Sequence, residues 1–134
     1  MLIGMAGLIV MAGLPGAGKS AVAEALGRAL PAPVVSVDPI EAAMWRAGVS
    51  RGEPTGLAAY VVAEAVADGV LGLGQRVIVD AVNAVEAARE QWRGLAARHG
   101  VPVAFIEVVC MDPLVHRRRL EGRMRGIEGF PEPT

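Results

Sequence analysis

The chain has 134 residues and a mass of 13.9 kDa, which fits one compact domain and leaves little room for two. Hydrophobic residues make up 53% of it and charged residues 20%, which excludes intrinsic disorder, and a single cysteine, Cys110, excludes an internal disulfide framework. The formal net charge of −1 provides no global field that would attract nucleic acid or an anionic membrane. We expect one domain over residues 1–134, cytoplasmic and without a membrane partner.

The apolar run at the start of the chain, residues 1–14, predicts a buried strand and not a signal or membrane segment. No positively charged region precedes it, and it is shorter than the roughly 20 apolar residues that a spanning helix needs. Its second half predicts a strand over 7–12, which a glycine-rich loop and a helix over 19–30 follow. Two prolines end that helix, and a short second strand over 34–37 stops at Asp38.

The remaining chain continues this alternation of strands and helices. The elements predicted after Asp38 are helices over 39–47, 56–72, 85–99 and 113–125 and strands over 76–79 and 102–110. Pro39 suits the first turn of a helix, Thr55 is predicted to cap the next helix, and the third strand stops at Asp80. Short apolar strands alternating with helices predict an α/β fold, a parallel sheet with helices on both faces. Sheets of this kind bind ligands at the carboxyl ends of their strands.

The most specific motif is the segment 13–20, which matches the P-loop (Walker A) pattern G-x-x-x-x-G-K-[ST] in full. Its glycines let backbone N–H groups turn toward a phosphate, and the following helix adds its positive N-terminal end. Lys19, the only lysine beside twelve arginines, would reach the β- and γ-phosphates, and the Ser20 hydroxyl would ligate Mg²⁺. Both side chains are expected to point at ligand and not into the core. The predicted nucleotide-binding residues are Gly13, Pro15, Gly16, Ala17, Gly18, Lys19, Ser20 and Ala21.

Acidic residues follow two of the predicted strands. Asp38 fits a general base that activates a phosphoryl acceptor, and it fits equally a helix N-cap before Pro39. Asp80 resembles the carboxylate that holds Mg²⁺ beside a phosphate loop, with a turn or cap role as the alternative. Asn83 is a candidate ligand for phosphate or substrate, and a turn asparagine is as well supported.

The predicted basic helix over 113–125 carries five of the twelve arginines. Arg119 and Arg123 lie four residues apart, hence on one helix face, where their planar guanidinium groups suit phosphate oxygens. A solvated basic face is the alternative. Nucleic-acid binding would need aromatic side chains for stacking, and few are present, so a nucleic-acid partner is disfavoured but stays open. Trp45 and Tyr60 flank the loop over 48–55 and either line an acceptor pocket or simply pack.

These motifs together resemble the small P-loop kinases often labelled "AAA family ATPase", a grouping similar to chloramphenicol phosphotransferase, polynucleotide kinase and zeta toxin. The resemblance rests on the phosphate loop, Ser-Val-Asp38, Val-Ile-Val-Asp80 and the arginine segment, and it covers about residues 7–134. It implies a P-loop NTPase three-layer α/β/α sandwich with strand order 2-3-1-4-5. Relatives continue beyond the matching segment, so the last strand is expected to be missing here.

The resemblance further implies an ATP- and Mg²⁺-dependent phosphotransferase. Asp38 then matches the aspartate that activates the acceptor, and Arg119 and Arg123 match the arginines of a lid, with Arg123 acting in catalysis together with Lys19. We expect transfer of the γ-phosphate to a hydroxyl of a small molecule. The alternatives are a kinase of polynucleotide 5′-hydroxyls and a non-catalytic nucleotide-binding module.

Overall fold

A parallel sheet of four strands forms the centre of the structure, a computed structural model that describes residues 6–13, 18–83 and 86–109. Within these ranges the strands are β1 (Gly7–Ala12), β2 (Val34–Ser36), β3 (Arg76–Asp80) and β4 (Val103–Glu107). Their order across the sheet is β2-β3-β1-β4, and every neighbouring pair is parallel. The order expected for the first four strands is confirmed.

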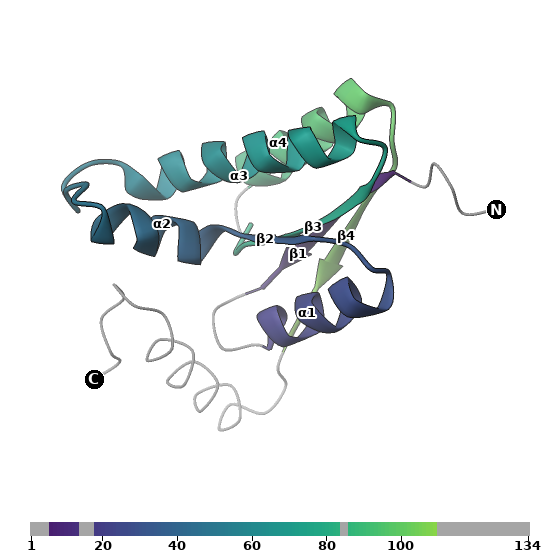
Figure 1. The fold of residues 1–134 in the computed structure, drawn as a ribbon, viewed down its shortest axis with the longest axis horizontal. Helices are drawn as coiled ribbons and strands as arrows, with labels where there is room; N and C mark the ends of the chain where they lie inside the picture. Colours follow the sequence, from purple (N-terminus) through teal and green to yellow (C-terminus); the bar gives the residue numbers. More distant parts are fainter. Residues whose placement is uncertain (1–5, 14–17, 84–85, 110–134) are drawn as a thin grey trace.

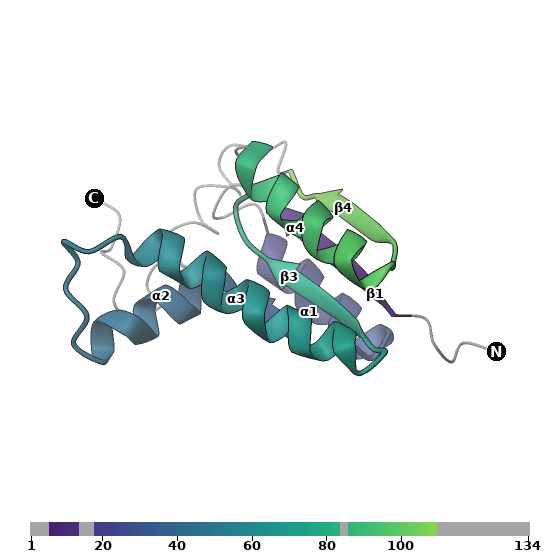
Figure 2. The ribbon, with the colours of Figure 1, turned by 90° about the horizontal axis from the view of Figure 1, so that it is seen from above.

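Helices cover both faces of the sheet (Figure 1). The helix α1 (Lys19–Ala29) lies on one face, whereas α3 (Thr55–Gly72) and α4 (Glu86–His99) run side by side over the other (Figure 2). The helix α2 (Val37–Arg46) packs against α3 beyond the end of β2. The predicted α/β sandwich with helices on both faces is therefore confirmed.

Successive side chains of each strand point to opposite faces of the sheet, so each face has its own hydrophobic core. Leu8 and Val10 of β1 belong to the larger core cluster, under α3 and α4, whereas Met11 belongs to the smaller one, which includes Ala23 of α1. In the same way Val77 and Val79 of β3 lie on the α3 side and Ile78 on the α1 side. A strand buried on both faces must be apolar at consecutive positions, which explains the continuous hydrophobic runs in the sequence.

The helix α3 is apolar on almost every side. It is the one helix of the described residues that is long and apolar enough to cross a membrane by length and composition, and 28% of it is buried. The side chains of Ala59, Ala63, Ala67 and Leu71 recur every four residues and pack into the larger core cluster. One face of α3 therefore packs on the sheet, and the length and composition of the helix are by themselves weak evidence for a membrane.

Three predicted boundaries are wrong. The second strand ends at Ser36 and α2 already begins at Val37, because Pro39 lies in the first helical turn, where its missing N–H group costs no hydrogen bond. Thr55 does not cap α3; its hydroxyl donates to Glu41 Oε2 at 2.7 Å and accepts from Trp45 Nε1 at 3.1 Å. The last strand is shorter than predicted, Val103–Glu107, and the predicted helix over 113–125 lies outside the described residues.

Candidate active site

Strand register brings three residues into line at the carboxyl edge of the sheet. Asp80 at the end of β3 pairs with Met11 of β1 on one side and with Ser36 of β2 on the other. The loop after β1 leads to α1, so the first residues of α1 reach the same edge. Sequence segments about 60 residues apart therefore meet around one carboxylate.

The Asp80 carboxylate accepts three hydrogen bonds. Lys19 Nζ donates to Oδ1 at 2.6 Å, while the hydroxyls of Ser20 and Ser36 donate to Oδ2 at 2.8 and 3.2 Å. Lys19 is the first residue of α1 and follows Gly18, whose φ of 94° favours glycine. The cluster thus consists of one carboxylate, one ammonium group and two hydroxyls.

The ion pair between Lys19 and Asp80 is buried, with 2% of each side chain exposed. The expectation that the Lys19 side chain avoids the protein interior is therefore wrong for this arrangement, because Asp80 holds its ammonium group inside. Its contact with a phosphate stays a prediction. A buried charge needs a partner because the low-dielectric interior does not solvate it. The pair consequently holds α1 to β3, and a phosphate that reached Lys19 would have to replace Asp80 as its counter-ion.

The donors around Asp80 fit a magnesium ion. Mg²⁺ prefers oxygen ligands and is usually bound through one or two protein groups together with substrate phosphates and water. The Ser20 hydroxyl and the Asp80 carboxylate are such oxygens and lie 2.8 Å apart. The described residues contain no cluster of three or more His, Cys, Asp or Glu side chains. They therefore offer no metal site formed by protein ligands alone.

Asp38 lies in the first turn of α2, partly buried. The N-cap position belongs to Ser36, so the interpretation of Asp38 as the N-cap is wrong. A carboxylate in the first turn still benefits from the positive end of the helix. Its charge also acts on Tyr60 of α3, since Asp38 is one of the groups that raise the Tyr60 pKa. Asp38 thus lies at the start of the helix that packs against α3.

Tyr60 keeps its proton at neutral pH. Burial is the main cause that raises the pKa of its hydroxyl above 10.0, and the charge of Asp38 adds to it, whereas hydrogen bonding to the backbone of Asn83 acts in the opposite direction. The Tyr60 hydroxyl oxygen accepts the Asn83 N–H at 3.2 Å, which leaves its own proton available to a further acceptor. Trp45, the other aromatic candidate, donates to Thr55 and lies under the Arg51 guanidinium.

Asn83 is a structural residue and not a phosphate or substrate ligand. It is fully buried, its amide donates to Met11 O at 2.9 Å, and its Oδ1 accepts from Trp92 Nε1 at 2.8 Å. Its backbone has a φ of 50°, a conformation that asparagine tolerates better than most residues. Both ends of the side chain are used within the protein. Asn83 thereby links the end of β1, just before the phosphate loop, to α4.

Replacement of Asn83 by alanine is expected to lower the free energy of unfolding by about 2–5 kcal/mol, because Trp92 Nε1 and Met11 O would be left buried without partners. Urea denaturation of both proteins measures this difference. In a double-mutant cycle with Trp92→Phe, the double variant should lose less than the sum of the single losses. Strict additivity would contradict the direct Asn83–Trp92 contact.

Of the other predicted site residues, the structure describes some and not others. Gly13 directly follows β1, and a Cβ atom there would come within 2.6 Å of Val108 O, so only glycine fits. Ala21 lies exposed in α1. The predicted residues Pro15, Gly16, Ala17, Arg119 and Arg123 lie outside the described residues. Ser36 was missed by the sequence analysis, although a hydroxyl at the end of β2, next in the sheet to Asp80, was a usable signal.

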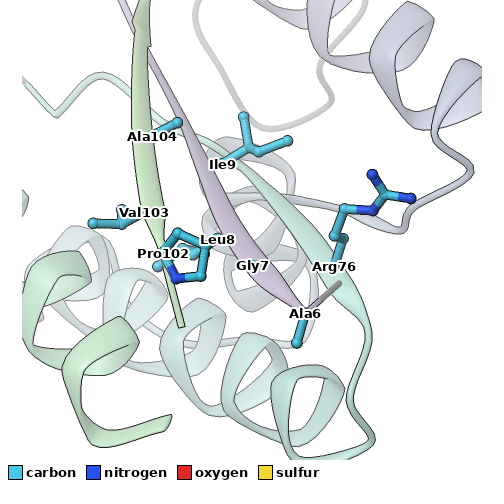
Figure 3. A pocket seen from close by; sticks show the side chains of 8 residues that line it. All are labelled: Ala6, Gly7, Leu8, Ile9, Arg76, Pro102, Val103 and Ala104. Atoms are coloured by element: carbon cyan, nitrogen blue, oxygen red, sulfur yellow. The ribbon is translucent and has the colours of Figure 1, made fainter. Parts of the chain in front are cut away.

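A hollow at the opposite end of the sheet is a poor candidate site. It measures about 190 Å³ and lies between the starts of β1 and β4 and Arg76 of β3 (Figure 3). Figure 3 shows the Arg76 side chain directed away from Pro102, and its guanidinium donates to Leu30 O at 3.0 Å. No polar side chain among its lining residues is therefore free to recognise a ligand there.

The solved structures that this chain resembles include several kinases. A candidate kinase from Chloroflexus aurantiacus superposes with a TM-score of 0.78 at 25% identity, covering 91% of this chain and 69% of that chain. The Mycobacterium tuberculosis APS kinase CysC, solved with AMPPNP and APS, gives a TM-score of 0.71 at 20% identity and 97% and 84% coverage. The Pnkp1/Rnl/Hen1 RNA repair complex gives 0.73 at 20% identity, with 95% and 40% coverage.

Comparison with curated protein sequences gives no match. The family model described as an AAA domain, AAA_33, matches residues 8–129, which is most of the chain. The phosphate-loop sequence, the parallel strand order and the kinase folds found among solved structures agree with this match. The chain belongs to the AAA domain family AAA_33 and has the P-loop kinase fold.

Proposed function

We propose that this protein is an ATP-dependent phosphotransferase that moves the γ-phosphate to a hydroxyl of a small-molecule acceptor. The observation that carries the proposal is the cluster of Lys19, Ser20 and Asp80 at the carboxyl edge of the sheet, with Asp38 on the neighbouring element. A protein that only binds nucleotide needs the phosphate loop but has no use for a second carboxylate beside it. The carboxylate at Asp38 therefore favours the enzyme over the non-catalytic module.

The proposed reaction is an in-line displacement at the γ-phosphorus. The acceptor oxygen forms a bond to phosphorus, the bond to the oxygen between the β- and γ-phosphates breaks, and ADP leaves. The proton of the acceptor hydroxyl passes to the Asp38 carboxylate, which acts as the general base. Lys19 leaves its pairing with Asp80 and neutralises charge on the β- and γ-phosphates.

Magnesium is the proposed metal, held by the Ser20 hydroxyl with Asp80 beside it. When bound, it supplies positive charge that offsets the charge of the phosphates. Ser36 holds the Asp80 carboxylate in orientation from the β2 side. The Ser20 and Asp80 oxygens already lie at hydrogen-bond distance, so little reorganisation is needed to present both to one ion.

Arg119 and Arg123 are the proposed lid arginines, on the basis of their four-residue spacing. Charge aimed at the transferring phosphoryl group stabilises the transition state, whereas a solvated charge does not. Arg123→Ala is therefore expected to lower kcat far more than the matched control Arg118→Ala. Steady-state kinetics at two salt concentrations measure this. Similar losses in both variants with a steep salt dependence would instead indicate a nucleic-acid patch.

The second candidate function is a polynucleotide 5′-hydroxyl kinase. The resemblance to the Pnkp1/Rnl/Hen1 RNA repair complex favours it, and the near-neutral charge and few aromatic residues oppose it. ADP release should be measured with a panel of small alcohols and, in parallel, with a 5′-hydroxyl oligonucleotide. We expect stimulation by members of the small-alcohol panel alone. Stimulation by the oligonucleotide alone would replace the small-molecule proposal with the polynucleotide one.

A further inference from the structure

A hollow of about 340 Å³ lies between the first turns of α3 and α4. This volume is within the usual range for sites that bind small molecules, roughly 300–1,000 Å³. The lining is small and largely apolar, and its polar groups come from a tyrosine and a glutamine. The lining residues are Gly56, Leu57, Tyr60, Ala87, Ala88 and Gln91.

Hydrogen bonds between α3 and α4 fix the distance between the two walls of this hollow. The Gln91 carboxamide on α4 donates to Tyr60 O at 3.1 Å and to Glu64 Oε1 at 2.9 Å, both on α3. Further along the same two helices, His99 Nε2 contacts Asp68 Oδ1 at 2.7 Å. These contacts in the first half and at the end of α4 hold the two helices at a fixed distance. The hollow is therefore formed before any ligand binds.

The hollow adjoins the candidate active site through Tyr60. The Tyr60 side chain lines the hollow, contacts the backbone of Asn83 just beyond β3, and feels the charge of Asp38. Glu41, three residues after Asp38 on α2, lies with its Oε2 3.4 Å from the position of a Cβ atom at Gly56, which lines the hollow. The helix that carries the proposed general base therefore flanks the hollow, and the Tyr60 hydroxyl offers a neutral donor there.

The charges around the hollow are unfavourable for an anion. Its described lining contains no cationic side chain. The two arginines on the adjoining part of α4 are engaged elsewhere. Arg89 and Arg93 lie over the Phe105 ring of β4, 6.0 and 5.1 Å from its centroid, and Arg89 Nε also donates to Asn83 O at 3.0 Å. Arg93 pairs in addition with Glu86 and Glu90.

One carboxylate flanks the hollow instead: Glu41 Oε2 lies 3.4 Å from the position of a Cβ atom at Gly56. The charge of Glu64, which accepts a hydrogen bond from Gln91, is compensated by its ion pair with Arg98 at 2.7 Å.

We propose that this hollow between α3 and α4 is the acceptor subsite and that it selects an uncharged alcohol with an apolar body over an anionic acceptor. The apolar part packs against Leu57, Ala87 and Ala88, and the reacting hydroxyl is directed toward Tyr60 and Asp38. This inference rests on the proposed phosphotransferase function and adds to it the location and the chemical class of the acceptor.

A matched pair of probes tests the selectivity by binding alone. Isothermal titration of 3-phenyl-1,2-propanediol and of 3-phenyllactate into the protein with AMPPNP compares a neutral alcohol with an anionic one of the same skeleton. We expect the diol to bind at least about tenfold more tightly, the size expected from one unfavourable charge near a protein surface. Equal binding, tighter binding of the lactate or no saturable binding of either probe would overturn the proposal.

Two lysine substitutions on α4 test the location. Ala87 lines the hollow and Ala97 does not, and both alanines are exposed. Ala87→Lys is expected to improve phenyllactate binding about tenfold, and the control Ala97→Lys to leave it unchanged. Equal shifts in both variants would place the binding site elsewhere. AMPPNP is titrated separately: its failure to bind wild-type protein counts against the phosphotransferase, whereas AMPPNP binding without diol binding counts against the subsite alone.

Discussion

Lys19→Met is expected to lower turnover of ATP by on the order of 10²–10³ and to destabilise the fold at the same time. The loss of turnover follows because no other lysine exists in the chain to meet the phosphates. The loss of stability follows because Asp80 would stay buried with only the hydroxyls of Ser20 and Ser36 as donors. Removing one partner of a buried ion pair costs about 3–5 kcal/mol, which urea denaturation measures.

A double variant separates the two effects. Lys19→Met with Asp80→Asn removes both charges, so the free energy of unfolding should recover most of its loss while turnover stays low. Arg98→Gln serves as the control, since it breaks the exposed ion pair with Glu64 and should cost less than about 1 kcal/mol. A Lys19→Met protein as stable as wild type would show that the buried pair contributes nothing to the fold.

Asp38→Asn is expected to lower kcat by on the order of 10²–10⁴ with little change in affinity for ATP. Asparagine has nearly the same shape but cannot take the proton of the acceptor hydroxyl. The lost interaction of the Asp38 charge with the positive end of α2 costs about 0.3–1 kcal/mol of stability. Steady-state kinetics with an acceptor, together with AMPPNP titration, measure both quantities.

The matched control for Asp38 is Glu41→Gln, one turn further along α2. Glu41 accepts a hydrogen bond from Thr55, which a glutamine carbonyl can also accept, so kcat should stay close to that of wild type. An Asp38→Asn enzyme with full kcat would remove the general base from the proposed mechanism. A Glu41→Gln enzyme as impaired as Asp38→Asn would indicate a general charge effect on α2 and not proton transfer.

The sequence predicted the order of elements because two local signals agree along the described chain. Apolar runs such as the one over 7–12 form strands buried on both faces, and glycine and proline mark the ends of the helices before and after them. The meeting of Lys19, Ser20 and Asp80 at one edge was predictable as well, since the carboxyl ends of parallel strands share an edge. These features depend on periodicity and chain direction, which a single sequence carries.

Other features depend on contacts between distant segments, which no local pattern encodes. The burial of Lys19 depends on the 2.6 Å contact with Asp80, 61 residues away. The role of Asn83 depends on Trp92 of α4 and Met11 of β1 reaching it together. Thr55 looked like a cap because its immediate neighbours are compatible with one, yet α2 packing against α3 gives its hydroxyl two better partners.

The central claim is that the chain transfers phosphate from ATP to the hydroxyl of a small acceptor, and the product of the reaction tests it most directly. Phosphorus NMR of the protein with Mg-ATP and 3-phenyl-1,2-propanediol should show a new phosphate monoester signal that grows in step with ADP. The signal should be lost when Asp38→Asn replaces the wild type. ADP accompanied only by inorganic phosphate, with no monoester for any member of the small-alcohol panel, would contradict the assignment as a small-molecule kinase.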